Sequence, residues 1–231
     1  YDILVGRRAV GEMRLEVMTV ANLTVLEGDF SAPFGRGTAP ATAGAESQIT
    51  YKGKETPKPA RGEATTRIGE YKIMEGKVTF EEKGDQWSVS AEATGFANTE
   101  RKPFETARRW TKTLTIGGDL LLTRAAFLYF APRLLPKPGK IENVTLVQFP
   151  DDIGFPEILA FFSGCVLERH EAGADGQADI TLHRVYAGGN IEPVLKMTVG
   201  RDGKMVEAKL GFQGGGRFKF TLRPQASALE Q

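Results

Sequence analysis

The feature that most constrains the fold is a period-two alternation of apolar and polar residues, interrupted by turn sequences about every ten residues. It is clearest in residues 180–222, where Ala187-Gly188-Gly189-Asn190, Gly200-Arg201-Asp202-Gly203 and Gly214-Gly215-Gly216 separate four alternating runs. Successive side chains of a strand point to opposite faces of a sheet, so each run predicts a strand with one buried face. This segment therefore predicts four antiparallel strands joined by tight turns.

The same alternation recurs nearer the N-terminus, in residues 10–20 and 87–94, and turn pairs such as Glu75-Gly76 divide residues 71–94 into a meander. The 27 glycines and 12 prolines supply the turns that many short strands need. We predict a mainly β fold, a large curved antiparallel sheet or open β-barrel with one or two short helices. The 231 residues fit a single β-rich domain spanning 1–231.

Residues 31–64 break the pattern. Their first part is poor in large apolar side chains, and Pro57 and Pro59 lie among several Lys and Arg residues further on. Only residues 48–51 resemble a strand. We interpret about 31–64 as a long flexible insertion, which is either a functional lid or a disordered loop.

Two apolar segments in the middle of the chain are compatible with either helix or strand. In residues 119–131, Asp119 is a suitable helix N-cap and Pro132 a suitable stop, so a helix is favoured there. Residues 155–162 leave the same choice open, and Pro156 suits a first helical turn. No run reaches the roughly 18 apolar residues that a membrane-spanning helix needs, so no transmembrane segment is predicted.

The charge balance argues against nucleic-acid binding. Thirty basic and 29 acidic residues give a net charge of +1, without the basic excess of a dedicated nucleic-acid binder. The basic residues around Trp110, and those of the last four strands, are interpreted as solvated or salt-bridged strand faces. Cys165 cannot form an intramolecular disulfide, and its apolar surroundings predict a buried, inert thiol.

No catalytic, cofactor or metal signature emerges. Ser163 lacks the nucleophile-elbow pattern because residue 161 is Phe, and no phosphate-binding glycine motif occurs. His183 shares the polar face of its strand with Asp179, which leaves a metal-assisted hydrolase as one hypothesis. We otherwise predict no catalytic residues, no metal and no cofactor.

A few loose features resemble the bacterial envelope half-barrels, namely the Lol-type lipoprotein carriers and related families of unknown function. They are the opening strand pair around Gly6 and Val10-Gly11-Glu12, the apolar stretch leading to Pro138-Gly139-Lys140, and the closing Pro193-Val194-Leu195 strand with its Gly200 turn. The 31–64 insertion and the lack of a lipid-attachment cysteine near Tyr1 depart from the carriers. The resemblance implies a half-barrel fold and a periplasmic or otherwise extracytoplasmic location, and no functional residue carries over.

The leading functional hypothesis is non-catalytic binding of a lipid or other hydrophobic small molecule. An apolar segment such as 120–135, with only Arg124 and Arg133 charged, must be covered on nearly all sides or must face a ligand. The predicted lining residues are Leu121, Leu122, Phe127, Leu128, Phe130, Trp87 and Trp110. The alternatives are a structural module that docks an envelope protein partner, and a hydrolase without a sequence signature.

Overall fold

The computed structural model describes residues 1–5, 7–34, 41–53, 55–69, 71–95, 108–148, 160–211 and 218–225. Within them, fifteen strands and one helix form a mainly β fold. The strands hydrogen-bond in the order β8-β7-β6-β5-β4-β3-β2-β1-β15-β14-β13-β12-β11-β10-β9. The order is open, because β8 and β9 end it and do not pair with each other in the described part of the chain.

The chain divides into two compact units. Unit 1 comprises residues 1–13, 118–146 and 162–231, and unit 2 comprises residues 14–117 and 147–161. Strand β2 (Arg8–Val20) contributes residues to both.

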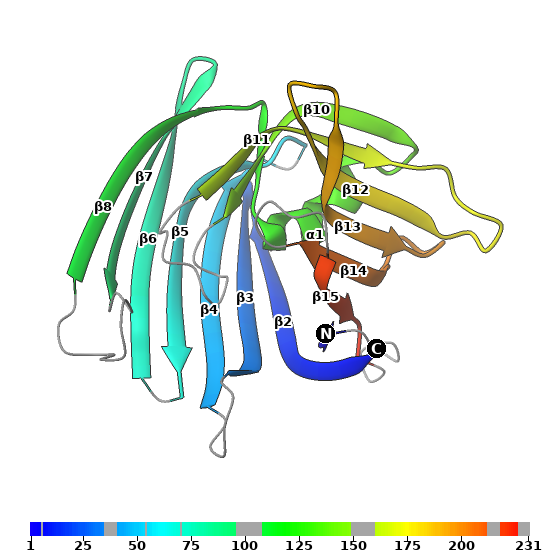
Figure 1. Cartoon of the computed structure of the whole chain (residues 1–231). Helices are drawn as coiled ribbons and strands as arrows, with labels where there is room; N and C mark the ends of the chain where they lie inside the picture. The colour runs from blue at the N-terminus through cyan, green and yellow to red at the C-terminus, as the bar shows by residue number, and fades with distance from the viewer. Residues whose placement is uncertain are drawn as a thin grey trace. The chain divides into compact units, whose positions relative to one another are not determined.

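Unit 2 is an antiparallel meander in which each strand pairs with the next along the chain (Figure 1). After β2 its strands are β3 (Leu23–Phe34), β4 (Ala41–Lys52), β5 (Lys58–Ile68), β6 (Tyr71–Lys83), β7 (Gln86–Gly95) and β8 (Arg108–Gly117). The β3–β4 ladder runs unbroken from Leu23↔Lys52 to Phe34↔Ala41, so the register of these long strands is fixed over twelve pairs.

Unit 1 holds the remaining strands and the helix. Its strands are β1 (Asp2–Val5), β9 (Leu120–Leu122), most of β10 (Gly139–Gln148) and of β11 (Ala160–Arg169), β12 (Ala178–Val185), β13 (Ile191–Val199), β14 (Met205–Gly211) and β15 (Phe218–Arg223). The last two residues of β10 and the first two of β11 belong to unit 2. The β1–β15, β11–β12, β12–β13, β13–β14 and β14–β15 pairings are antiparallel, whereas β9 lies parallel to β10. The four predicted C-terminal strands are confirmed as β12 to β15.

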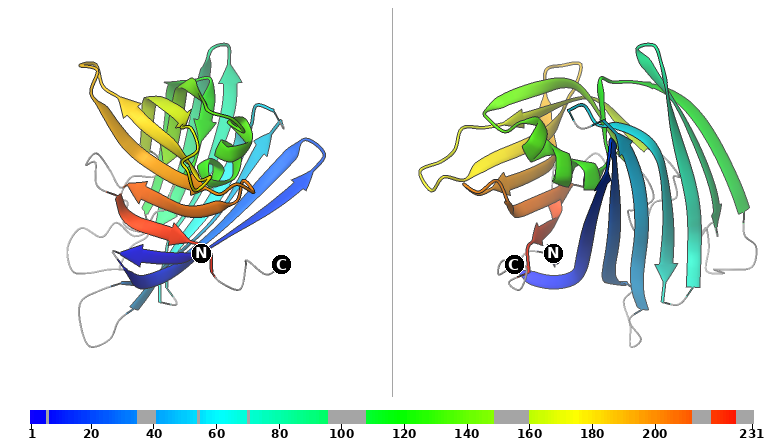
Figure 2. Two further views of the ribbon diagram at one scale, coloured as in Figure 1. Left: turned by 90° about the vertical axis from the view of Figure 1, so that its right-hand side faces the viewer. Right: turned by 180° about the vertical axis from the view of Figure 1, so that it is seen from behind.

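Helix α1 (Arg124–Leu134) packs against β9 and β13 within unit 1 (Figure 2). The predicted helix is confirmed, but its boundaries were wrong. Residues 120–122 form β9, and Thr123, not Asp119, is the N-cap, its hydroxyl accepting a hydrogen bond from the Ala126 N–H at 3.2 Å. Pro132 lies inside the helix, whose final turn is closed by the Leu135 N–H and the Ala131 carbonyl.

The interpretation of residues 31–64 as an insertion with one short strand is corrected by the structure. Apart from residues 35–40 and 54, which lie outside the described part, the segment contains the end of β3, all of β4 and most of β5. Pro59 fits because it sits next to the register shift between β4 and β5, where a missing N–H donor is tolerated. Segment 31–64 is therefore part of the sheet.

Two smaller boundaries also differ from expectation. Glu75-Gly76 was expected to be a turn but lies inside the continuous strand β6. The undecided segment 155–162 falls largely outside the described residues, and its end begins strand β11. In the described part of the chain there is one helix, the lower of the predicted numbers.

Candidate ligand-binding surfaces

Five of the seven predicted lining residues lie together in unit 1, on β9 and α1. They are Leu121, Leu122, Phe127, Leu128 and Phe130, and all are buried, with Phe127 fully so. Helix α1 is buried on more than one side, because Ala125, Ala126 and Ala131 are buried as well. The helix therefore belongs to the core of unit 1, and whether these side chains also touch a ligand stays a prediction.

The two tryptophans belong to unit 2. Trp87 is buried at the start of β7, where it pairs with Ile116 of β8. Trp110 pairs with Ala93 in the same ladder, and its side chain lies outside the described part of the structure. The predicted set is thus divided between the two units.

Unit 2 has an apolar face that the sequence reasoning missed, built from three rows of residues in register across β3 to β7. The central row contains only small residues: Gly28, Ser47, Ala64, Gly76 and Ala93. One flanking row is Leu26, Ile49, Gly62, Val78 and Ala91, and the other is Phe30, Ala45, Thr66, Met74 and Gly95. Trp87 and Val89, which alternate with outward residues on β7, lie on this same face.

These small residues were overlooked because none is a strong apolar signal by itself. They become a surface only when the cross-strand register places them side by side. Small side chains leave the backbone of the sheet close to whatever packs on this face, and Ala64, Val78 and Ala93 are themselves buried within the protein. We call the three rows together the trough.

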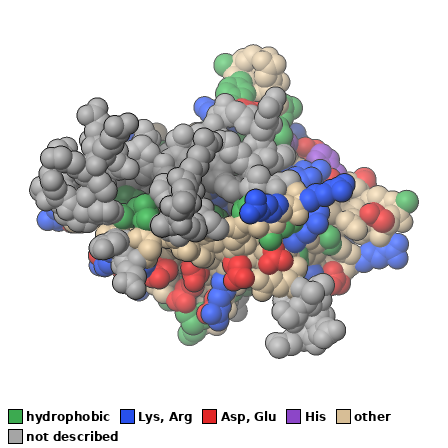
Figure 3. All heavy atoms as spheres, turned by 60° about the horizontal axis from the view of Figure 1, so that its bottom comes forward, with side chains coloured by type: hydrophobic (Ala, Val, Ile, Leu, Met, Phe, Trp, Pro, Cys, Tyr) green, Lys and Arg blue, Asp and Glu red, His purple; other side chains and the backbone are tan. Residues whose placement is uncertain are grey.

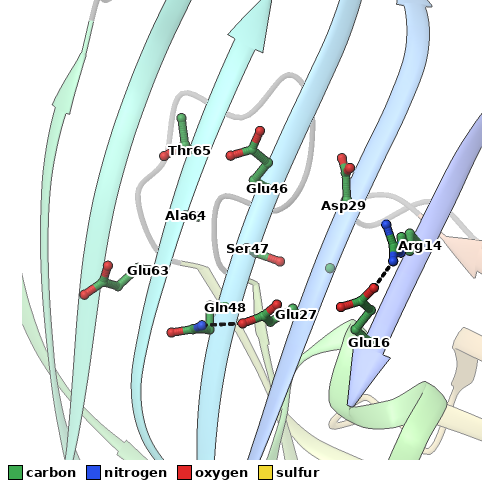
Figure 4. Close-up of a pocket in the computed structure, with 11 residues that line it drawn as sticks. Arg14, Glu16, Glu27, Asp29, Glu46, Ser47, Gln48, Glu63, Ala64 and Thr65 are labelled. Carbon is green, nitrogen blue, oxygen red and sulfur yellow. Dashed lines mark hydrogen bonds and ion pairs between the residues drawn. The ribbon is translucent and has the colours of Figure 1, made fainter. Parts of the chain in front are cut away.

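The opposite face of unit 2 is polar. A hollow of about 410 Å³ lies over β2 to β5, and Figure 4 shows its acidic side chains, with Ser47 and Ala64 between them. Its carboxylates come from Glu16, Glu27, Asp29, Glu46 and Glu63. This polar lining does not suit an apolar ligand.

Most of these carboxylates have a donor nearby. Glu16 pairs with Arg14, Glu46 lies 3.5 Å from Arg67, and Glu63 lies 3.7 Å from Lys77. The Gln48 amide donates to Glu27 at 2.6 Å. Partners this exposed are screened by water, so the hollow is best described as part of a solvated, salt-bridged strand face.

The structure does not form the hypothesised metal site from His183 and Asp179 among the described residues. Lys196 binds the Asp179 carboxylate at 2.6 Å and the Thr198 hydroxyl donates to it at 2.7 Å, which keeps the pKa of Asp179 low despite partial burial. His183 is buried, with its Nε2 4.0 Å from Glu168. Among the described residues, no group of three metal-ligating side chains could hold an ion.

Cys165 is fully buried in β11, as predicted. Its thiol donates to the Phe162 carbonyl at 3.3 Å, and burial raises the pKa of the thiol to about 11. A thiol with so high a pKa is almost entirely protonated near neutral pH, so Cys165 is a poor nucleophile.

The expected salt bridges of the C-terminal strands are confirmed where the structure describes them. Lys209 and Arg223 both bind Glu207, and Lys196 binds Asp179. Near Trp110, Arg109 pairs with Glu92, whereas residues 101–107 lie outside the described part. Figure 3 shows acidic and basic side chains intermixed on the described surface, in keeping with the balanced net charge.

No described helix is long and apolar enough to cross a membrane. Comparison with family models, curated proteins and solved structures finds no match to this chain. The resemblance to envelope half-barrels therefore stays a prediction.

Proposed function

We propose that this protein binds a hydrophobic or amphipathic ligand, without catalysing its conversion, in the bacterial cell envelope. The observation that supports this best is the apolar face of unit 2. A continuous trough of small residues, flanked by rows with larger apolar ones and bearing a buried Trp87, suits an extended apolar chain. The envelope location is supported by the resemblance of the sequence to half-barrel proteins.

The affinity in this proposal comes from apolar surface that the ligand and the small residues remove from water when they come into contact. Each Å² of apolar surface removed from water contributes about 25 cal/mol, before the cost of ordering the ligand. A flexible acyl chain can follow a row of Gly, Ala and Ser across several strands, whereas a fully packed row of Leu or Phe would fill the same space. Ala64 and Ala93, at the centre of the trough, are buried, so a ligand that contacts them would be enclosed by the protein.

The experiment that tests this proposal is native mass spectrometry of freshly purified protein, followed by organic extraction and lipid analysis. Ala64→Met fills the central row and should reduce the amount of extracted ligand strongly. Thr65→Met, next to it on the opposite face of β5, is the matched control and should retain ligand. Equal extraction from the two variants, or no apolar ligand even after incubation with a lipid extract, would count against the proposal.

Substitutions in α1 do not provide this test. Phe127 is fully buried in unit 1, so Phe127→Asp would place a charge in the core and unfold the protein together with any site. Ala64→Met adds volume at a buried position but no charge, so unchanged circular dichroism and Tm must verify that the fold is retained before ligand extraction is compared.

A second candidate function is docking of an envelope protein partner, and the edge strand β8 favours it. All ten β7–β8 residue pairs form without a register shift, and β8 has no second strand neighbour in the described part of the chain. A long regular edge can accept a partner strand through its free backbone groups. Thr113→Pro should abolish capture of such a partner, whereas Thr79→Pro would disrupt the meander itself.

The hydrolase hypothesis has no comparable support. Its two named residues are occupied by other contacts, Asp179 by Lys196 and His183 by its packing beside Glu168. Metal analysis of the purified protein is the direct test, and a stoichiometric metal would restore this hypothesis.

A further inference from the structure

The turn between β2 and β3 carries an unusual cluster of exposed apolar side chains. Met18 is 49% exposed, Val20 72% and Leu23 42%, and we call these three residues the β2–β3 tip. The tip forms the end of the blue hairpin in Figure 2 (left). Large apolar residues grouped at a protruding turn are a recognised mark of an interaction surface.

The tip interrupts a face that is otherwise polar. Along β2, the outward positions before Met18 are Glu12, Arg14 and Glu16, all exposed. On β3 the outward residues beyond Leu23 soon become Glu27 and Asp29, which line the polar hollow. Folding does not require apolar side chains at these exposed positions, so their presence at one end of the hairpin calls for another explanation.

Cationic side chains lie beside the tip. Leu23 pairs directly with Lys52 of β4, so the two side chains share one face of the sheet. In the next row, Val25 pairs with Thr50 and Thr50 with Arg61 of β5. Lys52 and Arg61 are both exposed, and neither has an acidic partner among the described residues, unlike Lys58, which binds Glu82 at 2.7 Å.

A backbone hydrogen bond joins the end of β4 to the β2–β3 turn. The Gly53 N–H, immediately after β4, donates to the Asn22 carbonyl in the β2–β3 turn at 2.9 Å. This hydrogen bond fixes the end of β4, and with it Lys52, next to the apolar tip.

We propose that the β2–β3 tip and the adjacent Lys52 and Arg61 form a docking surface for an anionic lipid bilayer. The tip side chains enter the interface between headgroups and acyl chains, and the two cations bind the lipid phosphates. This surface lies on the polar face of unit 2, outside the proposed ligand trough, and its function does not depend on that trough.

Charge distinguishes a bilayer from a second copy of the chain as the occupant. In a two-fold dimer the same patch meets itself, so Lys52 and Arg61 would face a second set of identical cations. An anionic membrane offers complementary charge and an apolar layer within reach of the same side chains.

A second exposed apolar hairpin supplies a matched control. Val185 and Ile191 pair at the end of the β12–β13 hairpin and are 40% and 63% exposed. Here the neighbouring cation is engaged, because the Arg184 guanidinium lies over the Phe162 and Tyr186 rings and Tyr186 bonds to Glu192. Within the part of the chain that the structure describes, this hairpin has similar apolar exposure without an unpaired cation beside it.

The test is flotation of the protein with phosphatidylcholine vesicles, with and without phosphatidylglycerol. We expect binding to the anionic vesicles only. The triple variant Met18→Thr, Val20→Thr, Leu23→Thr should weaken binding about tenfold or more, whereas Val185→Thr with Ile191→Thr should bind like the parent. Threonine keeps the β-propensity at each position, and unchanged circular dichroism and Tm would verify the fold.

The charge contribution is tested separately. Each of Lys52→Gln and Arg61→Gln should weaken binding to anionic vesicles about fivefold, and added salt should reduce this difference. Lys137→Gln and Lys204→Gln, at exposed positions of unit 1, are the controls. An environment-sensitive fluorophore on Val20→Cys should shift to the blue with anionic vesicles, and one on Ile191→Cys should not; buried Cys165 does not compete for the label.

Three outcomes would overturn the proposal: no flotation with anionic vesicles, equal flotation with neutral ones, or parental binding by the tip variant. A concentration-dependent dimer that the tip variant abolishes, without vesicle binding, would identify a second copy as the occupant instead. Loss of the ligand trough through Ala64→Met should leave vesicle binding intact, so failure of either proposal can be recognised independently.

Discussion

The two units bury their apolar residues in different ways. Among the described residues, the largest fully buried side chains of unit 1 are Ile3, Leu121, Leu122, Phe127, Leu146, Leu167, Ile180, Leu182 and Leu195, whereas those of unit 2 are Tyr51 and Leu26. Unit 2 instead lines its apolar face with Gly, Ala and Ser in register. The comparison shows that similar strand pairing can bury either large or small apolar side chains, depending on which residues occupy alternate positions.

The largest expected difference between the units concerns truncation of a buried side chain. Phe127→Ala in unit 1 should lower the free energy of unfolding by about 3–5 kcal/mol, because it leaves a cavity in a well-filled core. Val89→Ala in unit 2 should cost about 2 kcal/mol. Chemical denaturation measures both, and equal losses would mean that the interiors are packed alike.

Added side-chain atoms should destabilise unit 2, whereas removal of side-chain atoms should destabilise unit 1 more strongly. At Gly95, a Cβ atom would lie 2.5 Å from the Ile73 carbonyl oxygen and 3.0 Å from the Met74 Cα, both of which are backbone atoms. Gly95→Ala should therefore destabilise the protein by about 1–3 kcal/mol.

Gly117→Ala, at the end of the neighbouring strand β8, is the control for that substitution. Nothing lies within 4 Å of the added Cβ there, so the Tm should change little. Similar losses of Tm for the two variants would show that close approach of the β6 backbone at Gly95 is not the cause.

A pH effect near neutrality should arise in unit 1, where His183 lies in β12. Burial lowers the pKa of His183 from its ordinary value of 6.5, although Glu168 opposes this. The unfolded chain therefore binds more protons than the folded one below pH 6.5, and stability decreases as the pH falls through that value.

In His183→Gln this part of the pH dependence should disappear, because the titrating group is gone. His170→Gln, at an exposed position, should retain it. Unfolding curves at a series of pH values measure the effect, and an unchanged slope in His183→Gln would assign it to another group.

The smallest effect is expected on the polar face of unit 2. Lys58 contacts both carboxylate oxygens of Glu82 at 2.7 Å, but both side chains are 45% exposed. Lys58→Ala should therefore change the unfolding free energy by less than about 1 kcal/mol, and added salt should reduce the difference further. A larger loss would mean that this face stabilises the unit more than its exposure suggests.

Strands were predictable where the chain alternates large apolar and polar residues. Strands β12 to β15 show this pattern, and so does β7 from Trp87 to Ala93. In β4, residues 48–51 were predicted as a strand, but the first half, Ala41-Thr42-Ala43-Gly44-Ala45, was missed because it has no large apolar residue to mark a buried face. Its conformation is set by two neighbouring strands that satisfy its backbone groups, and β-propensity depends strongly on such context.

For the candidate surfaces too, the sequence revealed individual residues but not which of them lie together. The apolar segment around Phe127 was evident in the sequence, but its assignment to the core of unit 1 required the packing of α1 on β9 and β13. Cross-strand register links residues that are far apart in the chain. It forms the trough from Gly28 to Ala93, and it places Leu23 beside Lys52.

The sequence by itself determined the strand-rich class, the antiparallel C-terminal strands, the central helix and the burial of Cys165. Each follows from local periodicity or composition, which act over a few neighbouring residues. Only the tertiary structure decided that residues 31–64 belong to the sheet, that small residues from five strands form one face, and that Asp179 binds Lys196. These outcomes depend on which strands become neighbours and in what register, and that choice is made by the whole chain.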